Sequence, residues 1–152
     1  MGNETARAAV EQRMKLNAAA REFIGDGIDA TLVTLNADGS PQVTVVWVAV
    51  ESTPDGDELV SAHLAEYQKT RNVRRDPRVA VTIVKPTLGQ QSPYLAITGT
   101  ARITEGGAPE LLKKLAKTML GSDEHFPPPN SPPGLLTRIR IDKVGGMGPW
   151  AS

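Results

Sequence analysis

The chain has 152 residues, of which 39% are hydrophobic and only 4% aromatic, so we expect one domain with a modest core of aliphatic side chains. Lys and Arg together number 17, as do Asp and Glu, and this zero net charge argues against a general nucleic-acid-binding protein, which is usually basic. There is no cysteine, which excludes a disulfide framework, a thiolate metal site and a cysteine nucleophile.

The first predicted element is a helix from Asn3 to Ile24. Apolar residues recur there close to helical spacing, and Gly25 and Gly27 follow as a stop signal. The segment lacks the apolar core of a signal peptide, and no run in the chain approaches the roughly 20 apolar residues that span a bilayer. From these features we expect a soluble, cytoplasmic protein with no membrane partner.

Two strands are expected next, over residues 28–36 (IDATLVTLN) and 42–50 (QVTVVWVAV), joined by a turn whose Asn, Asp and Gly tolerate positive φ. Alternation gives the second strand two faces, one with Val43, Val45, Trp47 and Ala49 and the other with Thr44, Val46, Val48 and Val50. Both faces are largely apolar, so both should be covered. Double-sided burial, a flat ligand and a partner subunit are the open explanations. Residues 52–57 are predicted to be a loop.

The stretch from Ser61 to Val84 carries most of the functional information. It predicts a strand over residues 58–64, a basic helix over residues 65–76 that ends before Pro77, and a strand over residues 78–84. A helix start offers unpaired N–H groups, and cations and amides near it suit phosphate oxygens. The residues of that kind are Lys69, Arg71 and Asn72. Spacing alone favours the alternative, an exposed basic face on a connecting helix, because K-x-R-N is a short motif.

The remaining chain predicts two more strands and one helix. The strands cover residues 94–104, with a bulge or close approach at Gly99, and residues 135–144; the helix covers residues 109–120. A loop with five prolines fills residues 122–134, and the tail over residues 145–152 contains Trp150, which we expect to dock. The short connections favour antiparallel pairing of six strands in one closed or split barrel with a few flanking helices.

Little conventional catalytic chemistry is evident. The two histidines, His63 and His125, do not have the spacing of a metal pair. Ser61 lies near His63 on one strand face, but no third residue that would orient a catalytic pair is evident. Neither a G-x-G-x-x-G motif nor a Walker lysine is present, which argues against dinucleotide or nucleoside-triphosphate binding by those routes.

The order of these motifs resembles the pyridoxamine-phosphate-oxidase-like split β-barrels. The resemblance lies in TLVTLNADGSPQVTVVWV, YQKTRNVRRDPRVAVTIV and YLAITGTARIT, and it covers about Ala18 to Val144. The pair T-L-x-x-D-G-x-P-x-V and K-x-R-N-x-x-R-D-P-R is specific to the superfamily. Within it, the chain is most similar to the oxidoreductases that depend on the deazaflavin coenzyme F-420, although these motifs discriminate poorly between flavin and deazaflavin users.

The resemblance implies a single domain over residues 1–152 that forms a six-stranded antiparallel split β-barrel of the FMN-binding type. It also implies a homodimer with two cofactor sites at the subunit interface. The implied cofactor residues are Lys69, Arg71 and Asn72 for the phosphate, Ser61 and His63 beside it, and Pro41, Gln42, Val43, Thr44, Val45, Val46 and Trp47 along the ring. Tyr94 and Trp150 are the candidates for the partner subunit's contribution.

The implied activity is two-electron hydride transfer from coenzyme F-420 to a small unsaturated or conjugated organic substrate. No residue is nominated as a catalytic acid or base, and no metal is expected. An FMN enzyme of the same fold and a non-catalytic carrier of a flavin or deazaflavin are the alternatives.

Overall fold

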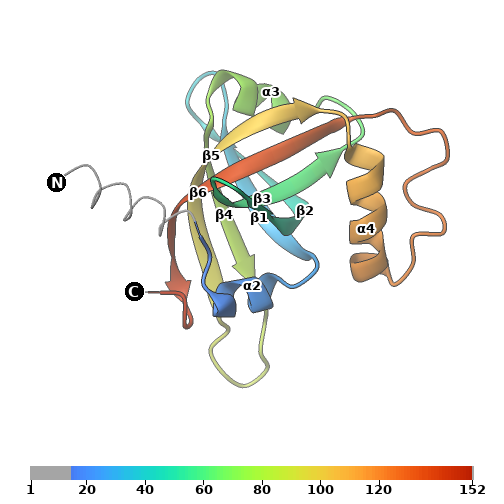
Figure 1. Ribbon diagram of the computed structural model, residues 1–152. Helices are drawn as coiled ribbons and strands as arrows, with labels where there is room; N and C mark the ends of the chain where they lie inside the picture. The colour runs from blue at the N-terminus through green and yellow to red at the C-terminus, as the bar shows by residue number, and fades with distance from the viewer. Residues whose placement is uncertain (1–14, 152) are drawn as a thin grey trace.

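The computed structural model describes residues 15–151, and in it six antiparallel strands close into a barrel in the order β1-β2-β3-β6-β5-β4 (Figure 1). The strands are β1 (Ile28–Leu35), β2 (Pro41–Thr53), β3 (Gly56–His63), β4 (Arg78–Val84), β5 (Tyr94–Glu105) and β6 (Leu135–Met147). The helices are α2 (Ala18–Ile24), α3 (Gln68–Arg75) and α4 (Ala108–Leu120). The prediction of a mainly β, six-stranded antiparallel barrel is confirmed.

The barrel interior is filled by aliphatic side chains that alternate with outward-facing residues along each strand. The fully buried members are Leu32, Val48, Leu59, Ile83, Leu95, Ile97, Ile139 and Ile141. Because a barrel of only six strands has little interior volume, branched aliphatic residues fill it without large aromatics, as the composition indicates.

The barrel is split along one flank, between β2 and β3. These two strands pair only from Ala49 opposite Val60 to Thr53 opposite Gly56. Earlier residues of β2 pair with β1 alone, and later residues of β3 pair with β6 alone. The facing edges of β2 and β3 therefore carry backbone groups that no strand pairs, and a ligand can hydrogen-bond to such groups.

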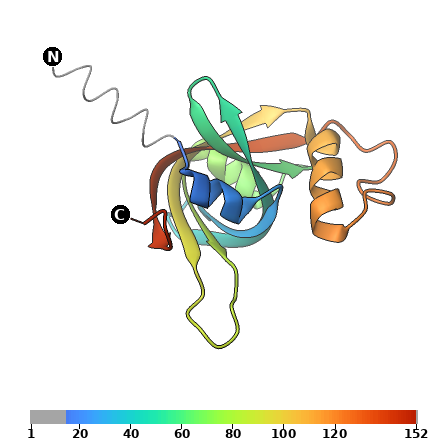
Figure 2. The same ribbon diagram turned by 60° about the horizontal axis from the view of Figure 1, so that its bottom comes forward.

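The three helices lie at different places around the barrel. Seen along the barrel, α2 lies over the near end and α3 over the far end, while α4 lies outside against β2 and β3 (Figure 2). Asn72 fastens α3 in place, because its Nδ2 donates to Thr34 Oγ1 at 3.0 Å and to Asn36 Oδ1 at 2.9 Å, both belonging to the end of β1 and its turn. The longest of these helices has 13 residues, and none within residues 15–151 is long and apolar enough to cross a membrane.

Several predicted boundaries are wrong, and β6, for example, runs to Met147, past its predicted end at residue 144. The predicted helix over residues 3–24 lies partly outside the described residues, and within them α2 begins only at Ala18, because Asn17 Oδ1 caps it by accepting from Ala20 N at 2.9 Å. The helix predicted from residue 65 begins at Gln68, because Thr70 Oγ1 accepts the N–H of Tyr67 at 2.8 Å and fixes that residue as the cap. The predicted loop over residues 52–57 is a tight turn between extended β2 and β3.

Gly99 lies at a β-bulge, as predicted. The β5–β6 register shifts between Thr98 and Gly99, and a Cβ atom at Gly99 would lie 2.4 Å from the carbonyl oxygen of Arg140. Only glycine allows this approach of the two backbones.

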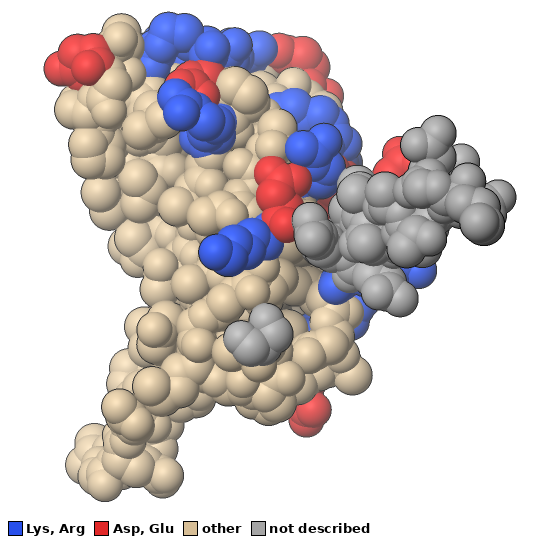
Figure 3. Space-filling view, turned by 90° about the vertical axis from the view of Figure 1, so that its left-hand side faces the viewer, with Lys and Arg blue, Asp and Glu red and all other residues tan. Residues whose placement is uncertain are grey.

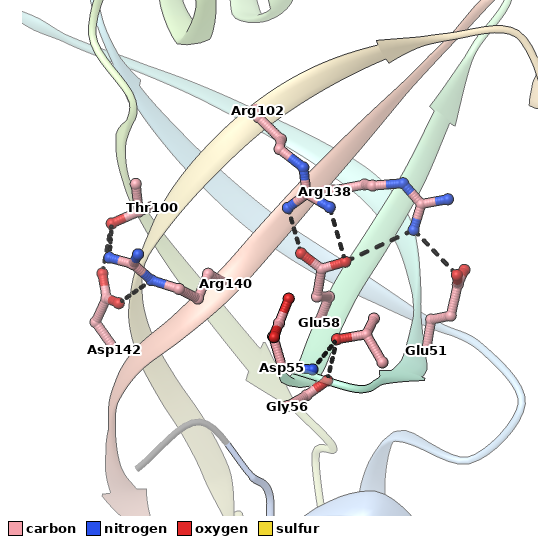
Figure 4. Close-up of polar contacts among 10 residues, drawn as sticks. Glu51, Asp55, Gly56, Glu58, Thr100, Arg102, Arg138, Arg140 and Asp142 are labelled. Atoms are coloured by element: carbon pink, nitrogen blue, oxygen red, sulfur yellow. Dashed lines mark hydrogen bonds and ion pairs between the residues drawn. The ribbon is translucent and has the colours of Figure 1, made fainter. Parts of the chain in front are cut away.

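The outer wall formed by β3, β5 and β6 carries a network of ion pairs (Figure 4). The Glu58 carboxylate, with 8% of its side chain exposed, accepts both terminal nitrogens of Arg102 and lies 3.7 Å from Arg138 Nη1. Arg138 also bonds Glu51 at 3.1 Å. Each guanidinium has a carboxylate partner, so this wall offers no excess charge for an anionic or cationic ligand.

Candidate functional site

A pocket of about 380 Å³ lies where β2 and β3 diverge. Its lining comes from β1, β2 and β3, from α3 and the chain leading into it, from α4 and from the proline-rich loop: Asp29, Val45, Val46, Trp47, Ser61, Ala62, His63, Leu64, Tyr67, Lys69, Leu112 and Phe126. Five of the predicted cofactor residues, Val45, Val46, Trp47, Ser61 and His63, thus meet Lys69 in one cavity. The split of the barrel creates this cavity, because paired strands would leave no room for it.

Ser61 and His63 line this pocket as buried polar side chains of β3. His63 is 4% exposed, and its Nε2 lies 2.8 Å from Thr137 Oγ1 on β6. Burial, with a smaller contribution from the nearby Lys69, lowers the pKa of His63 to about 4. His63 is therefore a neutral hydrogen-bonding group at pH 7. No group of three or more His, Cys, Asp or Glu residues within the described part of the chain is placed to hold a metal.

Lys69 is the one lysine or arginine in the pocket lining. Its Nζ lies 5.1 Å from the ring centroid of Tyr67, and the side chain is half-buried in the first turn of α3. Burial lowers the pKa of Lys69, and among residues 15–151 it has no carboxylate partner. A partly desolvated cation beside a helix N-terminus is the arrangement that attracts a phosphate or carboxylate.

The other two predicted phosphate residues lie differently. Arg71 is exposed, and its Nη2 donates to Gln68 Oε1 at 3.2 Å, so it can swing toward the helix start. Asn72 is fully buried and both hydrogens of its amide are donated, so a direct bond to a phosphate would break one of the contacts that hold α3. Lys and Arg side chains gather at the end of the barrel that carries α3 (Figure 3).

The β2 segment expected beneath a flat ring has one uncovered face. Val43 is 61% exposed and Val45 is 67% exposed, so burial of both faces within one chain is excluded, and a flat ligand or a partner subunit is left as the expected cover. Pro41, which begins β2, is also exposed. Gln42 accepts a hydrogen bond from Thr34 Oγ1 at 3.1 Å, whereas Thr44 Oγ1 is buried on the opposite face without a partner among the described residues. The uncovered valines fit the flat apolar body of a ligand.

Tyr94 and Trp150 are brought together, but they do not line this pocket. Trp150 Nε1 donates to the carbonyl oxygen of Tyr94 at 2.9 Å, and its ring centroid lies 4.7 Å from that of Phe23 on α2. The prediction that the tail tryptophan docks is confirmed. A role for these two residues at a cofactor site would require a second copy of the chain.

Six pocket residues were missed by sequence reasoning: Asp29, Ala62, Leu64, Tyr67, Leu112 and Phe126. The ring of Phe126 lies 5.7 Å from that of Trp47 in an edge-to-face arrangement. The available signal was an aromatic residue held within a proline-rich loop, although nothing in the sequence says which strand the loop approaches.

Comparisons with known proteins agree with the fold. Residues 16–148 match the family described as pyridoxamine 5'-phosphate oxidase. No curated protein matches the chain. A conserved hypothetical protein from Mycobacterium tuberculosis has 25% identity and a TM-score of 0.64, covering 84% of this chain and 81% of its own.

Two further solved structures share the fold. An F420 reductase has 21% identity and a TM-score of 0.57, covering 85% of this chain and 97% of its own. An FMN-binding protein from Syntrophomonas wolfei subsp. wolfei has 14% identity and a TM-score of 0.61, covering 97% of this chain and 92% of its own.

Proposed function

Because the chain belongs to the pyridoxamine 5'-phosphate oxidase family, we propose that it is an oxidoreductase that binds a flavin-type cofactor in the split between β2 and β3. The proposed cofactor is coenzyme F-420, used for two-electron hydride transfer to a small conjugated organic substrate. The observation that carries this proposal is Lys69, a half-buried cation without a carboxylate partner among residues 15–151, which lines the pocket at the start of α3.

The residues present fit a flat ring with an anionic tail. Lys69 and the first N–H groups of α3 suit a phosphate, and the exposed Arg71 can add a second cation. The apolar face at Val43 and Val45 suits a ring, and the unpaired edge of β2 suits its polar atoms. Asn72 serves as a positioning residue that holds α3, and with it Lys69, against β1.

The chemistry of hydride transfer belongs to the cofactor, since a reduced deazaflavin carries the hydride on a ring carbon. The protein's own residues bind, orient and exclude water. His63, neutral at pH 7, offers a hydrogen bond without adding charge beside the ring, and Leu112 and Trp47 reduce the access of water.

We also propose that the protein acts as a homodimer. The outer faces of β4, β5 and β6 form a shallow trough of about 290 Å³ lined by small residues, among them Ala80, Ala96 and Gly145. Together with the uncovered Val43 and Val45, this surface is an apolar area that a second copy would bury. Such packing would also explain how Tyr94 and Trp150 reach a cofactor site. Size-exclusion chromatography with light scattering tests it, and a monomer at micromolar concentration would contradict it.

The alternative is an FMN enzyme of the same fold, and the similarity to an FMN-binding protein is the observation that supports it. Both cofactors carry a flat ring and a phosphate, so Lys69 suits either. Fluorescence titration of the purified protein with each cofactor separates them: tighter binding of F-420 supports the proposal, and binding of FMN alone favours the alternative. Tight binding of either without turnover on a panel of conjugated substrates would indicate a carrier.

A further inference from the structure

The loop between α4 and β6, residues 121–134, brings one aromatic side chain to the pocket. Its five prolines restrict the backbone, and it is tied to α4, because Lys117 Nζ lies 3.5 Å from Asp123 Oδ2 and Ala108 N donates to Pro133 O at 3.0 Å. Phe126 is thereby held half-buried against the pocket wall. A side chain on a restrained loop is suited to recognition, because little freedom is lost when a ligand binds.

Phe126 and Trp47 form an aromatic corner. Their ring centroids lie 5.7 Å apart with an interplanar angle of 74°. In such an edge-to-face pair, a flat molecule can stack on one ring while it meets the other, and aromatic faces carry the negative part of the quadrupole.

A carboxylate lies beside this corner. Asp29 on β1 is directly opposite Trp47 in the β1–β2 register, lines the same pocket, is exposed, and forms no ion pair with any residue the structure describes. Lys69 lines the same pocket but forms no ion pair with Asp29, and its helix α3 is fastened at Thr34, five residues and about 17 Å further along β1 than Asp29. His63 is neutral, so Asp29 has no cationic partner among residues 15–151.

From this placement we propose that Asp29, Trp47 and Phe126 form the substrate end of the pocket and select a flat organic cation. An uncompensated carboxylate next to two aromatic rings favours a delocalised positive charge, which gains both the Coulomb attraction and the cation–π contact. The inference rests on the proposed function for the identification of this end as the substrate's. The anionic part of the cofactor and the cationic substrate would then be drawn to opposite ends of one cavity.

Isothermal titration calorimetry with two flat probes tests the proposal. N-methylquinolinium is a permanent cation, and 2-methylquinoline is its neutral counterpart at mildly alkaline pH. We expect the protein to bind the cation at least tenfold more tightly. Asp29→Asn should remove this preference while retaining the neutral probe's affinity, and Phe126→Leu should weaken both probes. Asp26→Asn, an exposed carboxylate in the turn before β1 that does not line the pocket, is the matched control and should change neither.

Equal affinity for the two probes, no detectable binding of the cation, or a preference that survives Asp29→Asn would each overturn the proposal. Circular dichroism of every variant checks that the barrel is intact. Cofactor titration of the same samples keeps the two proposals apart. If neither F-420 nor FMN binds while the Asp29-dependent preference for the cation remains, the proposed function is refuted and the cation-selective end is supported. If a cofactor binds but the preference for the cation is absent, only the cation-selective end is refuted.

Discussion

Replacing Lys69 with methionine should weaken the binding of phosphate-bearing cofactors roughly ten- to hundredfold. Methionine keeps much of the apolar stem and removes the ammonium group. A hydrogen bond to a charged group is worth about 1.5–3 kcal/mol, which corresponds to about one to two factors of ten in affinity. The upper part of this range is expected, because Lys69 is half-buried and its pKa is lowered by burial, so its charge is only partly solvated before the ligand arrives.

The assay compares ligands with and without the phosphate. Fluorescence titrations with F-420 and FMN, and with the dephosphorylated ring compounds, measure how much of the affinity depends on that group. Lys69→Met should affect only the phosphorylated forms. Arg71→Met should cost less than about fivefold, because an exposed pair contributes up to about 1 kcal/mol. Arg78→Met, which removes an exposed cation paired with Asp76, is the control and should change nothing. Equal weakening of both ligand forms by Lys69→Met would refute the assignment of Lys69 to the phosphate.

Three further predictions concern stability, each measured as the free energy of unfolding in urea. Asn72→Ala should lower this free energy by about 1–3 kcal/mol, because the substitution leaves Thr34 and Asn36 without their hydrogen-bond donor. Gln90→Ala, in an exposed loop, is the control and should change the free energy by less than about 0.5 kcal/mol. Glu58→Gln should also cost about 1–3 kcal/mol, since two guanidinium groups lose a nearly buried carboxylate, and Glu51→Gln, at the exposed rim, should cost less than half as much. The pKa of His63 is about 4 in the folded chain and 6.5 in the unfolded chain, so between these values the unfolded chain binds the extra proton. The free energy of unfolding should therefore fall by up to about 3 kcal/mol as the pH drops from 6.5 to 4. His63→Gln should remove this contribution to the pH dependence.

The strands were predictable because their signals are local. Alternation and β-branched residues mark residues 78–84, and the prediction there matches β4 at both ends. The turn before β3 was not predictable in this way, because Thr53 bonds both the carbonyl oxygen of Gly56 and the N–H of Asp55, so a stretch with loop composition becomes a tight hairpin. The predicted first residues of the helices were wrong for a similar reason, because the start of a helix depends on which side chain caps it.

The candidate site was predictable only in part. The sequence shows that Lys69 and Arg71 are of residue types that suit a phosphate. It does not show that Lys69 is half-buried and Arg71 exposed, and this difference in burial distinguishes the two cations. Asn72 has the same polar character, yet the structure uses its amide to fasten α3. Asp29 and Phe126 join the pocket only through the β1–β2 register and the path of a long loop, and both are tertiary facts.

The fastening of the tail near α2 makes the barrel a candidate for circular permutation. Asn17 Nδ2 donates to the carbonyl oxygen of Pro149 at 3.1 Å, and the neighbouring Trp150 packs on Phe23, so the two ends of the described part of the chain meet. A short glycine-serine bridge could therefore join them, and new termini could open at Gly89 in the loop that projects between β4 and β5 (Figure 1). The rearranged gene would encode the same barrel with its N- and C-termini in the β4–β5 loop.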